Sequence, residues 1–231
     1  MRRTATAAAA AMLIGVAAAS AQTPPAAGLV PPPPGSVVQN QAVAFNGESA
    51  KNQWHAVVSK KRVGSGNGTN FYQWYLSLYG LQRGAYRLRY LSPRNGGPLS
   101  HVEQANAAKM WFPVAQVRIV GAASLMHSGV QQLVVQSHEM AADCGAATVT
   151  IFATKPGGSI GAVVTIKNPC DLNAKLGADG TSVELTGPYY KSDAPMCCPT
   201  NAHAAAVLRY QNGEWIETPN YFKVERDGGG P

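Results

Sequence analysis

The chain has 231 residues, of which 19 are Lys or Arg and 12 are Asp or Glu, so its formal net charge is +7. With the termini set aside, this length corresponds to one domain or two small ones. After the N-terminal residues no stretch is apolar for long enough to cross a bilayer as a helix, which excludes a helical integral membrane protein. The basic balance suggests an anionic neighbour.

Residues 1–21 have the pattern of a secretory signal peptide. Two arginines precede an alanine-rich apolar run over 6–18, and an A-x-A-type cleavage site ends at Ala21. The run is too short and too poor in leucine for a membrane anchor, and no Cys follows it to carry a lipid. We expect a periplasmic or secreted protein whose mature chain begins at Gln22.

The rest of the chain divides by composition. Residues 22–41 are rich in proline and predict an extended, solvated linker. The folded domain is expected over 42–224, with a basic part over 42–110 and a cysteine-containing part over 111–224. Residues 225–231 read as a loose tail.

The domain has the alternation of β-strands. Tyr72, Trp74, Leu76 and Leu78 recur with period two, and similar patterns continue as far as Tyr210. Turn signals such as "SGNGTN", "KPGG" and "YQNGE" separate these runs. The predicted fold class is mainly β, an antiparallel sheet or a sandwich or barrel-like arrangement, with one short helix over 101–110.

Two stretches of the domain resemble each other. "AYRLRYLSPRNGGPLSHV" at 85–102 aligns without gaps with "AATVTIFATKPGGSIGAV" at 146–163. Each reads as a strand, a glycine turn and a strand. A duplicated hairpin unit explains the likeness, and chance similarity between two hairpins is the alternative.

Positive charge gathers in the first half of the domain. From Lys51 to Arg118 there are ten Lys or Arg and one acid, Glu103. Such a face would attract an anionic envelope polymer or lipid headgroup, whereas nucleic acid is not expected outside the cell. A surface that only solubilises the protein is the alternative. The candidate binding residues are Lys60, Lys61, Arg62, Arg83, Arg87, Arg89 and Arg94, with Arg87 and Arg89 predicted on one strand face opposite Tyr86, Leu88 and Tyr90.

Four cysteines are expected to be oxidised in an exported protein. A hairpin turn centred near Gly157 would set Cys144 opposite Cys170, within reach of a cross-strand disulfide. Cys197 and Cys198 are adjacent, and their Cα atoms lie only about 3.8 Å apart, so a bridge between them would be strained.

Two disulfide schemes therefore remain open. In one, the Cys144–Cys170 bridge accompanies a vicinal pair that is bridged or free. In the other, Cys197 and Cys198 point to opposite faces of an extended chain and join Cys144 and Cys170 separately. The spacing does not match a zinc site or a C-x-x-C redox pair, so neither a metal nor another cofactor is expected.

No motif of nucleophilic or metal-dependent catalysis stands out. The chain has no G-x-S-x-G and no H-E-x-x-H. The stretch "QSHEMAADCG" at 136–145 brings His138, Glu139, Asp143 and Cys144 close together in sequence, a pattern more typical of a polar loop.

The C-terminal half, about residues 117–221, resembles a family of bacterial envelope lipoproteins of unassigned function. That family shares a Cys-Gly loop, a valine-rich hairpin, and then Tyr, Asp, Cys-Cys-Pro-Ser/Thr and a closing strand ending in Gly-x-Trp/Phe. The matching positions are Cys144, Gly145, Tyr190, Asp193, Cys197, Cys198, Pro199, Thr200, Tyr210, Gly213 and Trp215. The chain departs from the family in lacking the lipid-bearing Cys and in carrying Cys170.

Two hypotheses for function follow. The first is an exported, non-enzymatic envelope protein with a structural or binding role, exerted through the basic face. The alternative is a periplasmic hydrolase or redox protein whose site is not recognisable by motif. The second hypothesis needs a deep pocket in which His138 or His203 lies beside an acid.

Overall fold

The computed structural model describes residues 35–45, 53–66, 69–92, 116–138, 146–155, 159–191, 195 and 198–226. In these ranges the chain is all β, and the prediction of an antiparallel β fold is confirmed. The strands are β1 (Val37–Phe45), β2 (Gln53–Gly66), β3 (Thr69–Gln82), β4 (Ala85–Ser92), β5 (Gln116–Ala123), β6 (Gln132–His138), β7 (Ala147–Thr154), β8 (Ile160–Asn168), β9 (Asn173–Leu176), β10 (Ser182–Tyr189), β11 (Asn201–Gln211), β12 (Glu214–Thr218) and β13 (Lys223–Arg226).

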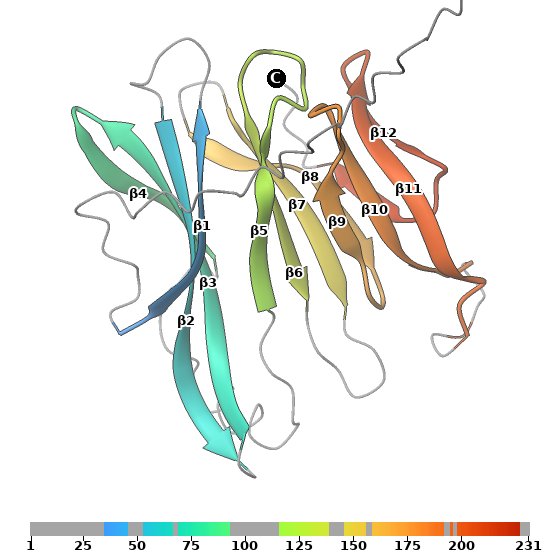
Figure 1. The fold of residues 1–231 in the computed structure, drawn as a ribbon, viewed down its shortest axis with the longest axis horizontal. Coiled ribbons are helices and arrows are strands. Elements are labelled where there is room, and N and C mark those ends of the chain that lie inside the picture. Colours follow the sequence, from blue (N-terminus) through green and yellow to red (C-terminus); the bar gives the residue numbers. More distant parts are fainter. Residues whose placement is uncertain are drawn as a thin grey trace, which may run out of the picture.

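The described strands form three antiparallel sheets. The first has the order β1-β2-β3-β4, the second β13-β8-β7-β6-β5 and the third β12-β11-β10-β9. In Figure 1 the five-stranded sheet, green to yellow, lies between the blue-to-teal first sheet and the orange third sheet. The chain thus builds its sheets in sequence order, except that β13 returns to the edge of the middle sheet beside β8.

Tight turns join neighbouring strands where the sequence supplies the necessary residues. Between β11 and β12 the turn residues Asn212 and Gly213 have φ values of 52° and 85°, which fits a type I′ hairpin. Arg83 and Gly84 do the same between β3 and β4, with φ values of 51° and 79°. The turn predicted from "YQNGE" is therefore confirmed.

The middle sheet is buried on both faces by two hydrophobic clusters. On β6, Val134 packs in the cluster shared with the third sheet, whereas its neighbours Leu133 and Val135 pack in the cluster shared with the first sheet. Period-two alternation sends adjacent side chains to opposite faces, so this strand contributes to both cores. The continuous burial of residues 132–136 follows from this position.

The first sheet packs one of its faces against the middle sheet. Ala56 and Val58 of β2, with Leu76 and Leu78 of β3, join Ile119, Leu133, Val135 and Phe152 in one cluster. Tyr72, Trp74, Leu76 and Leu78 share this face through their pairing with alternate residues of β2, as the sequence pattern predicts.

The opposite face of the first sheet is also buried, which the sequence pattern does not predict. Tyr75 and Ser77 are fully inaccessible to solvent, and His55 is 2% exposed. Burial raises the pKa of Tyr75 and lowers the pKa of His55. This face therefore carries polar side chains in a desolvated environment.

Several boundaries differ from the predicted ones. β1 begins at Val37, so the last residues of the predicted linker form a strand, which pairs along β2. β13 extends to Arg226, beyond the predicted end of the domain at 224. The helix expected over 101–110 lies outside the described residues.

The two stretches of the predicted duplication are not described equally: the structure gives the strand pairing of the second, but only the first strand of the first. In the second unit, β7 and the first residues of β8 pair as antiparallel strands, with a β-bulge between Ile151 and Phe152. Residues 85–92 form β4, which pairs with β3, and residues 93–102 lie outside the described ranges. The likeness between the two units stays a prediction.

Candidate functional site

The described part of the first sheet carries six cations and no acidic residue. These cations are Lys60, Lys61, Arg62, Arg83, Arg87 and Arg89; Arg94 lies outside the described residues. Five ion pairs join described residues, and all of them lie between residues 167 and 226. The excess of cations seen in the first half of the sequence is thus located on the first sheet, whereas these ion pairs all lie in the C-terminal part.

The six cations do not form one patch. Arg83, Arg87 and Arg89 lie at the end of the first sheet that contains the β3–β4 turn. Lys60 and Arg62 lie towards the other end of β2, and along that strand Lys60 is about 20 Å from Trp54, at the usual rise per residue. The buried Ala56 and Val58 separate the two groups.

Lys60 and Arg62 occupy a β-ribbon that extends beyond its neighbours. β1 pairs with β2 only as far as Lys60, and β4 pairs with β3 only as far as Leu76. From there to Gly66 and Thr69, β2 and β3 pair with each other. We call this segment, residues 60–66 and 69–75, the β2–β3 arm; in Figure 1 its end reaches past the lower end of β5.

Two aromatic rings face these cations across the arm. Lys60 pairs directly with Trp74, and Arg62 pairs with Tyr72. Directly opposed residues in an antiparallel pair share a face, so all four side chains lie on one side of the arm. The Lys60 ammonium lies 4.6 Å from the centroid of the Tyr72 ring and 5.3 Å from that of Trp74, which is within the range of cation–π attraction.

Lys61 belongs to the other side of the arm. Side chains alternate along a strand, and Lys61 pairs with Gln73, which is 5% exposed on the opposite face. The run Lys60-Lys61-Arg62 is therefore divided between two faces and does not act as one cluster.

Arg87 and Arg89 share a face, as predicted, but Tyr90 does not lie opposite them. A β-bulge falls between the pairs Leu78–Tyr90 and Tyr79–Leu88, and it puts Tyr90 on the core side against Phe152, with ring centroids 5.1 Å apart. Leu88 is 44% exposed instead of buried. The bulge thus breaks the simple alternation expected for β4.

Two of the four cysteines, Cys170 and Cys198, lie among the described residues. Cys170 is buried, and its Sγ accepts a hydrogen bond of 3.1 Å from the Tyr190 hydroxyl. Asn168 fixes the corner that carries Cys170 by donating to the carbonyls of Asp171 and Pro188, both at 2.8 Å. Cys198 is exposed, and Cys144 and Cys197 lie outside the described residues.

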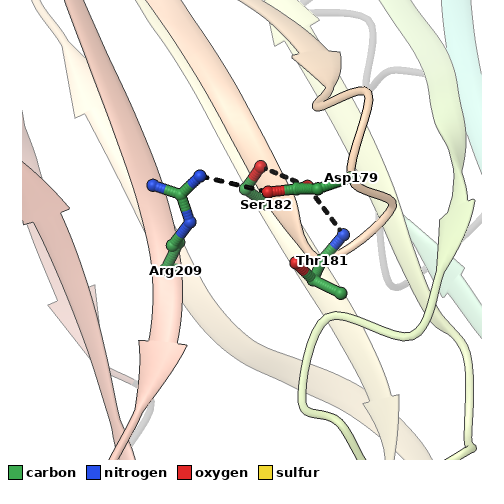
Figure 2. A network of polar contacts seen from close by, with 4 residues as sticks. All are labelled: Asp179, Thr181, Ser182 and Arg209. Atoms are coloured by element: carbon green, nitrogen blue, oxygen red, sulfur yellow. Dashed lines mark hydrogen bonds and ion pairs between the residues drawn. The ribbon is translucent and has the colours of Figure 1, made fainter.

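Two polar networks organise the third sheet. Asp179 accepts hydrogen bonds from the Ser182 hydroxyl, the Thr181 amide and the Arg209 guanidinium, at 2.7, 2.9 and 3.1 Å (Figure 2). These donors, the Ser182 hydroxyl first, hold the pKa of Asp179 well below its usual range. They tie the turn before β10 to β11, which is a structural role.

Glu217 forms the second network beside a cavity of about 460 Å³ that is lined by β12 and β13. Its carboxylate accepts from the amides of Tyr221 and Phe222, each at 3.0 Å, and burial raises its pKa. At the rim of the cavity Lys223 pairs with Glu225, and Arg226 with Glu214. The charged groups of this cavity are thus already engaged within the protein.

The cavity at β12 and β13 is not the site that the enzymatic hypothesis requires, which is a pocket with His138 or His203 beside an acid. Neither His138, at the end of β6, nor the exposed His203 of β11 lines that cavity. Among the residues that the structure describes, no group of three His, Cys, Asp or Glu could hold a metal ion, and no helix is long and apolar enough to span a bilayer.

No known family model matches the sequence, and no curated protein or solved structure shows significant similarity to the chain.

Proposed function

We propose that this protein is an exported, non-enzymatic component of a bacterial cell envelope that binds an anionic ligand through the cations of its first sheet. The observation that carries the proposal is the charge of that sheet, whose described residues include six Lys or Arg and no Asp or Glu. Such an excess of positive charge attracts polyanions and raises their local concentration.

The proposal includes export and oxidation. It is supported by the signal-peptide pattern of residues 1–21 and by the resemblance of residues 117–221 to envelope lipoproteins. We propose that Cys170 forms a disulfide, with Cys144 as its partner. Ala147 pairs with Asn168 at the end of β7 and β8, and in sequence Cys144 precedes this pair by three residues while Cys170 follows it by two.

A binding assay with two anionic probes tests the proposal. The full chain is titrated against vesicles of phosphatidylglycerol and phosphatidylcholine, and against polygalacturonate, in a series of salt concentrations. Binding to at least one probe should weaken steeply with salt, because exposed charges are screened beyond about 10 Å at 0.1 M. The charge reversals K60E/R62E and R87E/R89E show which end of the sheet is used.

Vesicles of phosphatidylcholine alone and methyl-esterified polygalacturonate serve as neutral controls. If binding to both anionic probes is absent, or is indifferent to salt and to both reversals, the basic sheet is only a solubilising surface and the proposal is wrong.

A further inference from the structure

The face of the β2–β3 arm that carries Lys60 and Arg62 is the same face that packs into the core. Trp74 is itself packed against the cluster that contains Val58 and Leu76. The two cations therefore lie on the inner side of the arm, which is turned towards the middle sheet. This position restricts the shape of what can reach them.

At the base of the arm, where Trp74 packs against the core cluster, the middle sheet adjoins the inner side, so a flat surface cannot lie against Lys60 there. An extended chain can run alongside the arm in the direction of its strands. A membrane-binding face would instead present cations and apolar tips on the outer side of a protein, in one plane. The geometry thus favours a linear polymer over a lipid surface.

The spacing and preorganisation of the cations also fit a polymer with repeated acidic groups. Lys60 and Arg62 are alternate residues of one strand, so their side chains emerge about 7 Å apart. The Lys60 ammonium is held over the Tyr72 and Trp74 rings, which lowers the entropy lost when it pairs with an anion. Tyr72 and Trp74 are partly exposed and offer apolar ring surface to the C–H groups of a sugar ring.

From this arrangement we infer that the inner side of the arm binds an acidic polysaccharide, with carboxylates at Lys60 and Arg62 and sugar rings against Tyr72 and Trp74. This inference rests on the proposed function and names the ligand class of that site. Single-stranded nucleic acid would use similar side chains, and it is a separate outcome of the test.

The experiment compares polygalacturonate with anionic phosphatidylglycerol vesicles and with oligothymidylate as ligands of the full chain. The variant K60M/R62M removes both charges and keeps apolar stems in the arm. We expect it to lower the affinity for polygalacturonate at least tenfold, equivalent to about 1.4 kcal/mol. The matched control K61Q removes one charge from the other face and should change the affinity less than twofold.

Two further variants separate the role of the rings and check folding. Y72L keeps an apolar side chain at position 72 but removes the ring. It should weaken binding to polygalacturonate without changing the number of charges. Urea unfolding of each variant, followed by far-UV circular dichroism, identifies any loss of affinity that arises from loss of the fold. If K60M/R62M does not fold, Y72L and R62Q decide the question.

The outcomes distinguish this inference from the proposed function. Tighter, arm-dependent binding of anionic vesicles or of oligothymidylate would overturn the inference and leave an anion-binding sheet. Binding of polygalacturonate that R87E/R89E abolishes and K60M/R62M does not would also overturn it. Failure of every anionic probe would overturn both.

Discussion

The ammonium group of Lys60 lies 4.6 Å from the centre of the Tyr72 ring, across the pairing of β2 and β3. A second ring, that of Trp74, lies 5.3 Å from the same ammonium. The arm that extends beyond β1 and β4 is thus held together by the side chains of its inner side as well as by its backbone ladder.

Replacement of Lys60 by Met should have a small effect on stability. The cation–π attraction at a partly exposed site is worth about 0.5–1 kcal/mol, and Met keeps an unbranched apolar side chain at this position. We expect the free energy of unfolding to fall by no more than that amount in urea titrations. A loss several times larger would mean that Lys60 has a role in packing which the contacts with Tyr72 and Trp74 do not explain.

Substitution of Asp179 should change the stability of the protein in acid. The folded pKa of this carboxyl is depressed by the Ser182 hydroxyl, the Thr181 amide and Arg209, so its contribution is present above its ordinary pKa of 3.8 and is lost as the pH falls towards the folded value. D179N should be less stable than the wild type at neutral pH, and the difference should shrink as the pH falls below that ordinary value.

Urea midpoints of the wild type and D179N measured across this acidic range check the prediction. A difference between the two proteins that does not change with pH would show that the charge of Asp179 does not contribute. D171N, at an exposed carboxyl that is not among the partners of Asp179, is the control.

Glu217 should have the opposite pH dependence. Burial raises its folded pKa, so its contribution to stability is fully present below the ordinary pKa of 4.5 and is lost as the pH rises through the folded value. E217Q keeps an acceptor for the Tyr221 and Phe222 amides and cannot ionise. We therefore expect E217Q to gain stability relative to the wild type as the pH rises through this range.

E217A tests the hydrogen bonds of the same side chain. It would leave the Tyr221 and Phe222 amides without their acceptor, and a buried polar group left unsatisfied costs about 1–3 kcal/mol. Chemical unfolding at a fixed pH should therefore rank E217A below both the wild type and E217Q. Equal stability of E217A and E217Q would contradict the role given to the carboxylate.

The proposed Cys144–Cys170 bridge makes a covalent prediction. A non-reducing digest of exported protein should contain one peptide pair joined through these two residues, and C144S/C170S should lower the free energy of unfolding by about 2–4 kcal/mol. A link from Cys170 to Cys197 or Cys198 would establish the long-range scheme instead. Free thiols at all four positions would contradict both schemes.

The class of the fold and the faces of most strands could be predicted from the sequence, because period-two alternation and turn residues are local signals. The alternation of Tyr72, Trp74, Leu76 and Leu78 is observed, and so is the Asn212-Gly213 turn. The division into three sheets could not be predicted, since it depends on pairings between distant strands such as β13 with β8.

Bulges account for the errors of register. The one in β4 moves Tyr90 to the core side, and the one between β7 and β8 shifts the pairing by one residue between Phe152–Ala162 and Ile151–Val164. An extra residue in a strand leaves no clear mark in a pattern of apolar and polar residues.

The candidate site could be predicted in its residue types but not in its geometry. The excess of cations is visible in the composition. The buried Ala56 and Val58, which separate the cations of β2 from those near the β3–β4 turn, follow from tertiary packing and could not be predicted. The turn signal at "SGNGTN" predicts that the two strands pair, but its register alone would set Lys60 opposite Tyr75 and Arg62 opposite Gln73. The bulge between Arg62 and Gly64 brings them opposite Trp74 and Tyr72 instead.

Oxidative footprinting of aromatic side chains, in the absence and presence of polygalacturonate, tests most directly whether the arm is the binding site. Tyr72 and Trp74 are partly exposed, as are Tyr210 and Tyr221 of the C-terminal part, so all four residues should be oxidised in the free protein. We predict that the polymer protects Tyr72 and Trp74 and leaves Tyr210 and Tyr221 unchanged. Bound polymer that protects Tyr210 or Tyr221 and leaves Tyr72 and Trp74 as reactive as in the free protein would contradict the account.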